Sequence, residues 1–369
     1  GRTLENRFFR ITFDAQTGAM KSIYDKELDR ELVSGDSPYG ANQYLYVSGG
    51  QGSSIVHSRG DRPEPELTLH DPQEARFEAR TAGPVQASMR VTTSAKRTPR
   101  IESTVTLYRD VKRIDIVNRL TKEKTYEKEA VYFAFPFRMK DPVVRLESPD
   151  GSFRPGVDQL DGACQDWHCL QEWASVSGAS HRVAWSSPDA PLVCLGDINR
   201  GTWGKARQPQ SGTLFSYAMN NYWFTNYRAG QGGDFTFRYA IRSFGDDADR
   251  TGVMRFGRGD ANPLQARTLA GGHDGALPLD GATFCTVEPG GVVLLTMKRA
   301  EDGDGYILRL QETEGRQRTA TVSLPRSTIG KAVLCNVVEE EKKVLPITGS
   351  SIEVPVDANG LGTVRVYFR

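Results

Sequence analysis

Apolar and polar residues alternate along most of this chain with a period of two, as they do in strands that bury one face. The alternation runs through residues 7–14 (RFFRITFD) and residues 18–26 (GAMKSIYDK), and Gln16-Thr17-Gly18 lies at their junction. Two alternating runs joined by a short segment that contains glycine are typical of a β-hairpin. We therefore expect a hairpin near the start of the sequence.

The same period continues through three further runs, which repeat about every ten residues as in sandwiches and barrels. They are residues 85–93, 101–110 and 113–121, and the apolar run at residues 130–137 (AVYFAFPF) is typical of a buried strand. No amphipathic pattern extends beyond about two helical turns. The 37 glycines and 19 prolines suit a chain with many turns. The pattern therefore predicts a mostly β protein.

A change of pattern around residues 246–270 marks a domain boundary. Residues 245–252 (GDDADRTG) and 257–264 (GRGDANPL) are polar, contain glycine and show no period. Six short runs with strand patterns follow, at residues 290–300, 305–312, 319–325, 331–339, 350–357 and 362–369. Six strands in about a hundred residues indicate a second, smaller β-sandwich. We place the large domain in residues 1–255 and the small one in residues 256–369.

The net charge argues against two kinds of binding partner. The 369 residues carry a formal net charge of +1, which gives no electrostatic basis for binding nucleic acid or an acidic membrane surface. Charged residues gather at residues 339–343 (EEEKK), where we expect a solvated turn between strands. No apolar run approaches the roughly 18 residues that span a bilayer, and no leader sequence is recognisable. We expect neither a nucleic-acid nor a membrane partner.

The cysteines indicate the redox environment. Five of them form an odd and scattered set, unlike a disulfide framework: Cys164, Cys169, Cys194, Cys285 and Cys335. This usage favours a reducing compartment, and we expect a cytoplasmic protein. The sequence starts with Gly1 rather than Met, so we also expect the natural polypeptide to extend upstream.

Several catalytic motifs are missing from the sequence. It contains no glycine-rich phosphate loop, no Gly-x-Ser-x-Gly elbow and no His-Glu-x-x-His pair. The five histidines are widely separated, so no metal site is predicted in this chain. The two carboxylates of a glycosidase are defined by their distance in space, and 46 acidic residues leave that chemistry open.

Tryptophan is concentrated in one region, since all five lie between Trp167 and Trp223. Residues 165–173 (QDWHCLQEW) hold two of them beside a histidine. Aromatic faces stack on the C–H faces of sugars, so Trp167, His168 and Trp173 are candidate sugar contacts. Tryptophans of a large β-domain more often fill a core or a domain interface, and a lone histidine among aromatic residues is more often structural than a metal ligand. The sequence leaves both interpretations open.

Residues 220–227 (NNYWFTNY) form a second candidate stretch. Three asparagines among four aromatic residues would each need hydrogen-bond partners if they were buried. Asn221, Tyr222 and Trp223 are therefore candidates for lining a cleft or a domain interface.

A long series of ordered motifs follows the pattern of a known family. Residues 5–33 (ENRFFRITFDAQTGAMKSIYDKELDRELV) match it at Gly18, Ser22, Ile23, Asp25, Lys26, Arg30, Glu31, Leu32 and Val33. Later matching segments are residues 132–137, 155–176, 187–198, 219–241 and 292–312. Together they cover essentially the whole chain, which resembles the region that follows the catalytic domain in family 38 glycoside hydrolases, the α-mannosidases.

The resemblance implies a fold and a place in a larger enzyme. The fold would be a large β-supersandwich similar to galactose mutarotase, followed by a small β-sandwich. The intact protein would be a retaining α-mannosidase, whose zinc, zinc ligands and aspartate nucleophile lie in an N-terminal α/β barrel upstream of Glu5. This chain would then hold no catalytic residue and no cofactor. Its partners would be that barrel, in the same polypeptide, and mannose-containing glycans.

The resemblance also implies a tyrosine at the rim of the active site. It falls within residues 39–46 (YGANQYLY), where Tyr44 is the candidate and Tyr46 the alternative.

Three other functions are compatible with the sequence. The tryptophan region could present a sugar platform, which would make the chain a stand-alone carbohydrate-binding module. A mutarotase-like sugar epimerase would need a convergent His and Glu acid–base pair, for which His168 and Glu172 form the only local pair. As metal ligands, these two residues would share one face of a helix because they are four apart, but two ligands do not define a metal site. A purely structural role, in which the β-domains brace the barrel, would leave an exposed patch at the lost interface.

Overall fold

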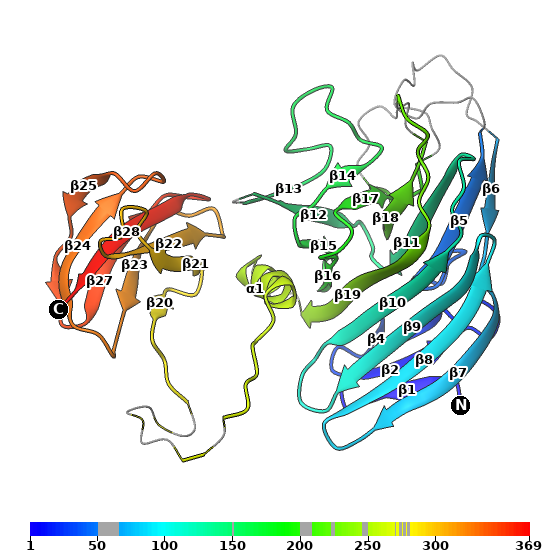
Figure 1. The fold of residues 1–369 in the computed structure, drawn as a ribbon, viewed down its shortest axis with the longest axis horizontal. Coiled ribbons are helices and arrows are strands. Elements are labelled where there is room, and N and C mark those ends of the chain that lie inside the picture. The colour runs from blue at the N-terminus through cyan, green and yellow to red at the C-terminus, as the bar shows by residue number, and fades with distance from the viewer. Residues whose placement is uncertain are drawn as a thin grey trace. The chain divides into compact units, whose positions relative to one another are not determined.

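The computed structural model describes residues 1–50, 66–149, 151–199, 209–222, 226–245, 250–269, 271–272, 275, 278 and 281–369. The chain divides into two compact units (Figure 1). The first comprises Gly1–Ser148, Ser152–Ala248 and Phe256–Asn262, and the second Pro149–Gly151, Asp249–Arg255 and Pro263–Arg369. Strands dominate the described residues, whose single helix is α1 (Arg250–Ala261). That part of the chain contains no helix long and apolar enough to cross a membrane.

Three sheets build the first unit. Their orders are β1-β2-β3-β4, then β13-β12-β15-β16-β19-β10-β9-β8-β7, and β14-β17-β18-β11-β5-β6. The strands are β1 (Thr3–Glu5), β2 (Phe9–Phe13), β3 (Met20–Asp25), β4 (Arg30–Glu31), β5 (Gln43–Gly49), β6 (Leu67–His70), β7 (Gln73–Ala82), β8 (Gln86–Ala95), β9 (Thr98–Tyr108), β10 (Ile114–Lys122), β11 (Glu129–Phe137), β12 (Val143–Ser148), β13 (Gly151–Phe153), β14 (His168–Cys169), β15 (Trp173–Ser177), β16 (His181–Ser186), β17 (Leu192–Leu195), β18 (Gly212–Asn220) and β19 (Gly233–Gly245).

The strand patterns of the sequence correspond to this part of the fold. The expected hairpin is β2 paired antiparallel with β3. The three runs predicted between residues 85 and 121 form a meander, in which β8 pairs with β9 and β9 with β10. These predictions are confirmed, because each run alternates between a buried and an exposed face.

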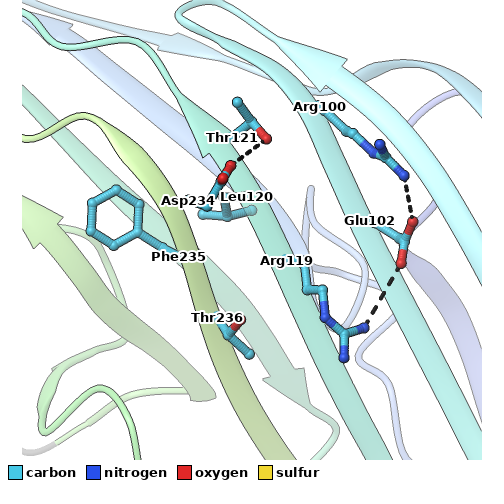
Figure 2. Close-up of a pocket in the computed structure, with 8 residues that line it drawn as sticks. All are labelled: Arg100, Glu102, Arg119, Leu120, Thr121, Asp234, Phe235 and Thr236. Carbon is cyan, nitrogen blue, oxygen red and sulfur yellow. Dashed lines mark hydrogen bonds and ion pairs between the residues drawn. The ribbon is translucent and has the colours of Figure 1, made fainter.

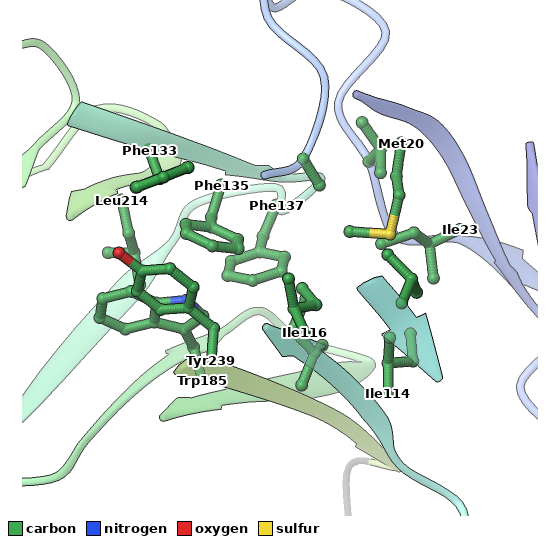
Figure 3. Close-up of a cluster of buried hydrophobic side chains, with 14 of the residues drawn as sticks. Met20, Ile23, Ile114, Ile116, Phe133, Phe135, Phe137, Trp185, Leu214 and Tyr239 are labelled. Carbon is green, nitrogen blue, oxygen red and sulfur yellow. The ribbon is translucent and has the colours of Figure 1, made fainter. Parts of the chain in front are cut away.

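The core of the first unit lies between the nine-stranded sheet and the two smaller sheets. Phe133, Phe135 and Phe137 of β11 point into it, where they meet Trp185 of β16 and Tyr239 of β19 (Figure 3). The intervening residues of β11 join a second apolar cluster on the opposite face of the six-stranded sheet. Every residue of β11 is therefore buried, which explains why its sequence is a continuous apolar run.

Two sheets with their own apolar core build the second unit. Their orders are β20-β23-β27-β26 and β21-β22-β28-β24-β25. The strands are β20 (Thr286–Glu288), β21 (Val292–Arg299), β22 (Tyr306–Glu312), β23 (Arg318–Ser323), β24 (Ile329–Cys335), β25 (Glu341–Val344), β26 (Ile347–Thr348), β27 (Ser351–Val356) and β28 (Leu361–Phe368). All six strands predicted here are present. The segment expected to be a turn, residues 339–343, instead enters strand β25 at Glu341.

The prediction that no helix exceeds about two turns is wrong, because α1 has 12 residues. Its buried positions include Val253, Met254, Phe256 and Gly257, which recur with a helical spacing. Three of the helical residues are glycines, a poor helix former, and this composition hid the period. The fold class itself is confirmed as mostly β, with a large sandwich followed by a small one.

Candidate functional site

A buried polar cluster lies at one end of the first unit, where β10 ends and β11 begins. We call Tyr46, Lys122, Glu129, Asn221 and Tyr222 the Glu129 cluster. The Tyr46 hydroxyl donates to Glu129 Oε2 at 2.7 Å, and Lys122 Nζ donates to Glu129 Oε1 at 2.6 Å. The side chains of Lys122 and Glu129 are 0% and 5% exposed. A charge pair this deeply buried depends on both partners, since either one alone would remain uncompensated.

Asn221 and Tyr222 tie the neighbouring strands to this pair. The Asn221 side chain accepts from the backbone N–H of Glu129 and donates to the backbone carbonyl of Glu127, both at 2.7 Å. The Tyr222 hydroxyl donates to the carbonyl of Gly49 at 3.2 Å. The buried Asn221 thus has the partners that its burial requires. Trp223, the third candidate of this stretch, lies outside the described residues.

The two candidate tyrosines of β5 are both buried. The Tyr44 hydroxyl lies 2.7 Å from Thr98 Oγ1, and its ring packs edge-on against Phe133. Burial raises the pKa of Tyr44 well above its usual value. The pKa of Tyr46 is also raised, first by burial and then by the hydrogen bond to Glu129. Both hydroxyls are therefore neutral, and a rim role for either tyrosine stays a prediction.

Next to the Glu129 cluster, two loops hold an exposed tyrosine ring, that of Tyr126, between two cationic side chains. Tyr126 is 46% exposed, with the Arg228 guanidinium 4.2 Å and the Lys124 ammonium 5.0 Å from its ring centroid. The hydrogen bond from Lys124 lowers the pKa of Tyr126. A Cβ on Gly230 would lie 2.5 Å from the carbonyl oxygen of Thr125, so the two loops pack too closely for any side chain there. Tyr126 is therefore exposed at a point where the two loops pack closely against each other.

A hollow of about 450 Å³ lies beside the Glu129 cluster. Its His70 ring lies 5.8 Å from the ring of Tyr46, and His70 Nε2 is 2.9 Å from Ser48 Oγ. Burial and then the charge of Lys96 lower the pKa of His70, so this histidine is neutral at neutral pH. The one carboxylate of the lining is that of Asp71. The hollow therefore lacks the two carboxylates of a glycosidase site.

The residues of the tryptophan stretch are not brought together. Trp167 packs against the apolar cluster on the outer face of the six-stranded sheet. Trp173 is buried on the other side of the nine-stranded sheet from the core, because its neighbours Ala174 and Val176 face that core. There it contacts Gly257 of α1. These tryptophans act as packing residues in two separate places, and their proposed sugar contacts stay predictions.

His168 is a buried strand residue. It is 5% exposed, its ring meets Phe153 edge-on, and β14 pairs it with Val193. Burial lowers the pKa of His168 to about 4, so the ring is neutral near neutral pH. His168 and Glu172 lie on no helix, so the shared helix face considered for two metal ligands is absent, and their role as an epimerase pair stays a prediction. Glu172 lies instead beside Glu147, whose Oε2 accepts from the Glu172 backbone N–H at 3.0 Å.

Sequence reasoning missed Lys122 and Glu129 as members of the cluster. They lie seven residues apart in the sequence, but their partner Tyr46 comes from a strand 83 residues before Glu129. An acid as the first residue of an otherwise apolar strand was the available signal, because such a residue must find a partner when buried.

No group of three or more His, Cys, Asp and Glu side chains that could hold a metal occurs among the described residues. The residues at hand thus do not fit a zinc site of the usual type, which needs at least three protein ligands.

Comparisons with known proteins agree with this architecture. Residues 4–187 match the profile of the glycosyl hydrolases family 38 C-terminal domain. Residues 291–363 match that of the glycosyl hydrolases family 38 C-terminal beta sandwich domain. The chain belongs to glycosyl hydrolase family 38, as a C-terminal region. No curated protein sequence matches it.

Comparison with solved structures shows what share of a complete family member this chain covers. An alpha-mannosidase from Enterococcus faecalis V583 has a TM-score of 0.73 at 14% identity, and the match covers 99% of this chain and 42% of that one. A family 38 protein from Enterococcus faecalis gives the same score and identity, with 99% and 44% covered. A galactose mutarotase-like protein from Lactobacillus casei ATCC 334 has a TM-score of 0.38 at 12% identity, with 66% of this chain and 99% of that one covered. The chain thus spans less than half the length of the two Enterococcus proteins.

Proposed function

We propose that this chain is the non-catalytic β-region of a retaining α-mannosidase and braces a catalytic barrel elsewhere in the same polypeptide. The observation that carries the proposal is the match of both units to C-terminal domains of one family of glycosyl hydrolases. The first Enterococcus protein is an alpha-mannosidase, and by analogy the reaction would be α-mannoside hydrolysis and the partner glycans would contain mannose.

The chemistry of a retaining glycosidase explains why a brace is useful. One carboxylate attacks the anomeric carbon while a second carboxyl group, about 5 Å away, protonates the leaving oxygen. Zinc bound in the catalytic part would hold ring hydroxyls. A shift of the reacting groups of about 1 Å can cost a hundredfold in rate, so a stiff support matters. The Glu129 cluster supplies such stiffness, because its buried ion pair and Asn221 fix the loop that carries Tyr126.

Within this proposal, the end of the first unit around Tyr126 faces the bound glycan or the barrel. The exposed ring and its two cations are available to a partner there. The compartment would be the cytoplasm, since all five cysteines are free.

The test compares two proteins on an aryl α-mannoside, each with and without a zinc chelator. We expect the longer natural polypeptide to hydrolyse the substrate and to lose activity with the chelator. The 369-residue chain should show no turnover in either condition. Zinc-dependent hydrolysis by the 369-residue chain alone would overturn the assignment as a non-catalytic region.

A further inference from the structure

The face of the nine-stranded sheet that points away from the core carries an ordered set of polar side chains. The register of β9, β10 and β19 places Glu102 opposite Arg119 and Arg119 opposite Thr236. In the next row, Arg100 lies opposite Thr121 and Thr121 opposite Asp234. These six side chains, which we call the sheet-face grid, line an open hollow of about 400 Å³ (Figure 2).

The acids of the grid are held in place by their neighbours. Glu102 is only 6% exposed, and its carboxylate lies 3.0 Å from Arg100 Nη2, 3.4 Å from Arg90 Nε and 3.8 Å from Arg119 Nη1. Thr121 Oγ1 donates to Asp234 Oδ1 at 2.8 Å. The groups are thus oriented before any ligand arrives, which lowers the entropic cost of binding.

The grid keeps hydrogen-bonding capacity for a ligand. The Arg100 and Arg119 side chains are 63% and 60% exposed, and each guanidinium has five N–H donors. A carboxylate has about four lone-pair sites, so Asp234 can still accept after bonding Thr121. The grid therefore offers donors and acceptors side by side.

The charge of the grid selects the kind of ligand. Two arginines and two acids give the six residues no net charge. Arg90, the third arginine beside Glu102, is balanced by Glu78 at 3.7 Å, so neither an anion nor a cation is favoured. Adjacent strands are about 4.8 Å apart, and alternate residues on one strand are about 7 Å apart. Donors and acceptors at these spacings match the hydroxyl groups around one or two sugar rings. A volume of about 400 Å³ also lies in the usual range for small-molecule sites.

We propose that the sheet-face grid binds a neutral carbohydrate of one or two sugar residues. The aromatic residue of the lining, Phe235, packs against the core, so the site binds through hydrogen bonds without a stacking platform. The dissociation constant should therefore be in the millimolar range, on the order of that of other sites with few apolar contacts. This site goes beyond the proposed function and does not depend on it, because it needs no catalytic domain.

The test is a titration of the ¹⁵N-labelled 369-residue chain with methyl α-mannoside and with mannobiose, followed by NMR. We expect saturable shifts of the amides of Arg119–Thr121 and Asp234–Thr236 and of the arginine Nε–H groups of the grid. Asp234→Ala and Arg119→Ala should weaken binding by about tenfold or more, the loss expected for one well-formed hydrogen bond to a charged group.

The second unit supplies a matched control. Thr321 Oγ1 donates to Glu353 Oε1 at 2.8 Å across β23 and β27, which repeats the Thr121–Asp234 arrangement away from the grid. Glu353→Ala should therefore leave sugar binding unchanged, and circular dichroism should show that every variant is folded.

Three outcomes would overturn the site. They are the absence of saturable shifts at tens of millimolar sugar, an unchanged affinity in Asp234→Ala, and an equal response to glycerol. Binding of a sugar phosphate without binding of the neutral sugar would overturn the assignment of a neutral ligand. None of these results would bear on α-mannoside hydrolysis by the longer polypeptide.

Discussion

Two buried carboxylates of the first unit have contrasting surroundings. Glu129 has a cation and a hydroxyl donor within hydrogen-bonding distance. Glu147, which is 1% exposed, has Arg258 Nη2 at 3.5 Å and the carboxylate of Glu172 as a neighbour. Burial and then the charge of Glu172 raise the pKa of Glu147 to about 7. The stability of the first unit should therefore respond to the protonation of this residue.

Glu147→Gln should change how stability depends on pH. The folded-state pKa of Glu147 lies above that of the unfolded chain, so between about pH 4.5 and 7 the folded protein holds a proton that the unfolded chain releases. The contribution of Glu147 to stability therefore falls as pH rises through this window. Relative to the variant, the free energy of unfolding of the natural chain should fall by about 2 to 3 kcal/mol from about pH 5 to about pH 8.

Denaturant unfolding followed by tryptophan fluorescence measures this change, since all five tryptophans lie in the sequence range of the first unit. The contribution of His168 to stability rises with pH, because burial lowers its pKa to about 4. This contribution is the same in the natural chain and in Glu147→Gln, so it cancels when the two are compared. Glu353→Gln, in the second unit, should behave like the natural chain. An equal difference between Glu147→Gln and the natural chain at both pH values would contradict the prediction.

At the scale of elements, the alternation of apolar residues located β2, β3 and β8–β11 in the first unit. The six strands predicted in the second unit are all present. Helix α1 could not be predicted, because its buried face is completed by contact with Trp173, a residue distant in the sequence. The partners of Glu129 could not be predicted for the same reason, since Tyr46 and Glu129 meet only through the pairing of β5 with β11.

Gly257→Ala should destabilise the first unit. A Cβ at this position would lie 2.4 Å from Trp173 Cδ1, so α1 could pack on β15 only after a shift. We expect a loss of about 1 to 3 kcal/mol in the free energy of unfolding, as for other overpacked sites. Denaturant unfolding monitored by tryptophan fluorescence gives this quantity.

Gly259→Ala is the matched control in the same helix. A Cβ there would meet nothing within 4 Å, and alanine favours a helix over glycine by about 1 kcal/mol. This variant should be as stable as the natural chain or more so. Equal effects of the two substitutions would show that helix propensity, and not the contact with Trp173, decides the outcome.

At the scale of the whole molecule, each unit has its own apolar core. The core of the second unit consists of residues between Val292 and Val366. Glu312 also organises a turn within this unit by accepting from the backbone N–H groups of Gly315, Arg316 and Asn359. Burial alone would raise the pKa of Glu312, but these donors together hold it below its usual value. The apolar core of the second unit thus lies entirely within Pro263–Arg369.

Residues Pro263–Arg369 should therefore fold as an isolated domain. Its amide NMR spectrum should be dispersed, and circular dichroism should show a cooperative thermal transition. A collapsed spectrum with no transition would show that the second unit depends on the remainder of the chain.

Strand β25 ends the five-stranded sheet of the second unit and has a consequence for how the protein behaves in concentrated solution. All four of its residues are exposed, and Lys342 and Lys343 stand in its middle. The outer edge of a sheet invites strands from other molecules, and lysines oppose this because their charges would have to be desolvated. The charged segment at residues 339–343 should therefore oppose edge-to-edge aggregation of this sheet.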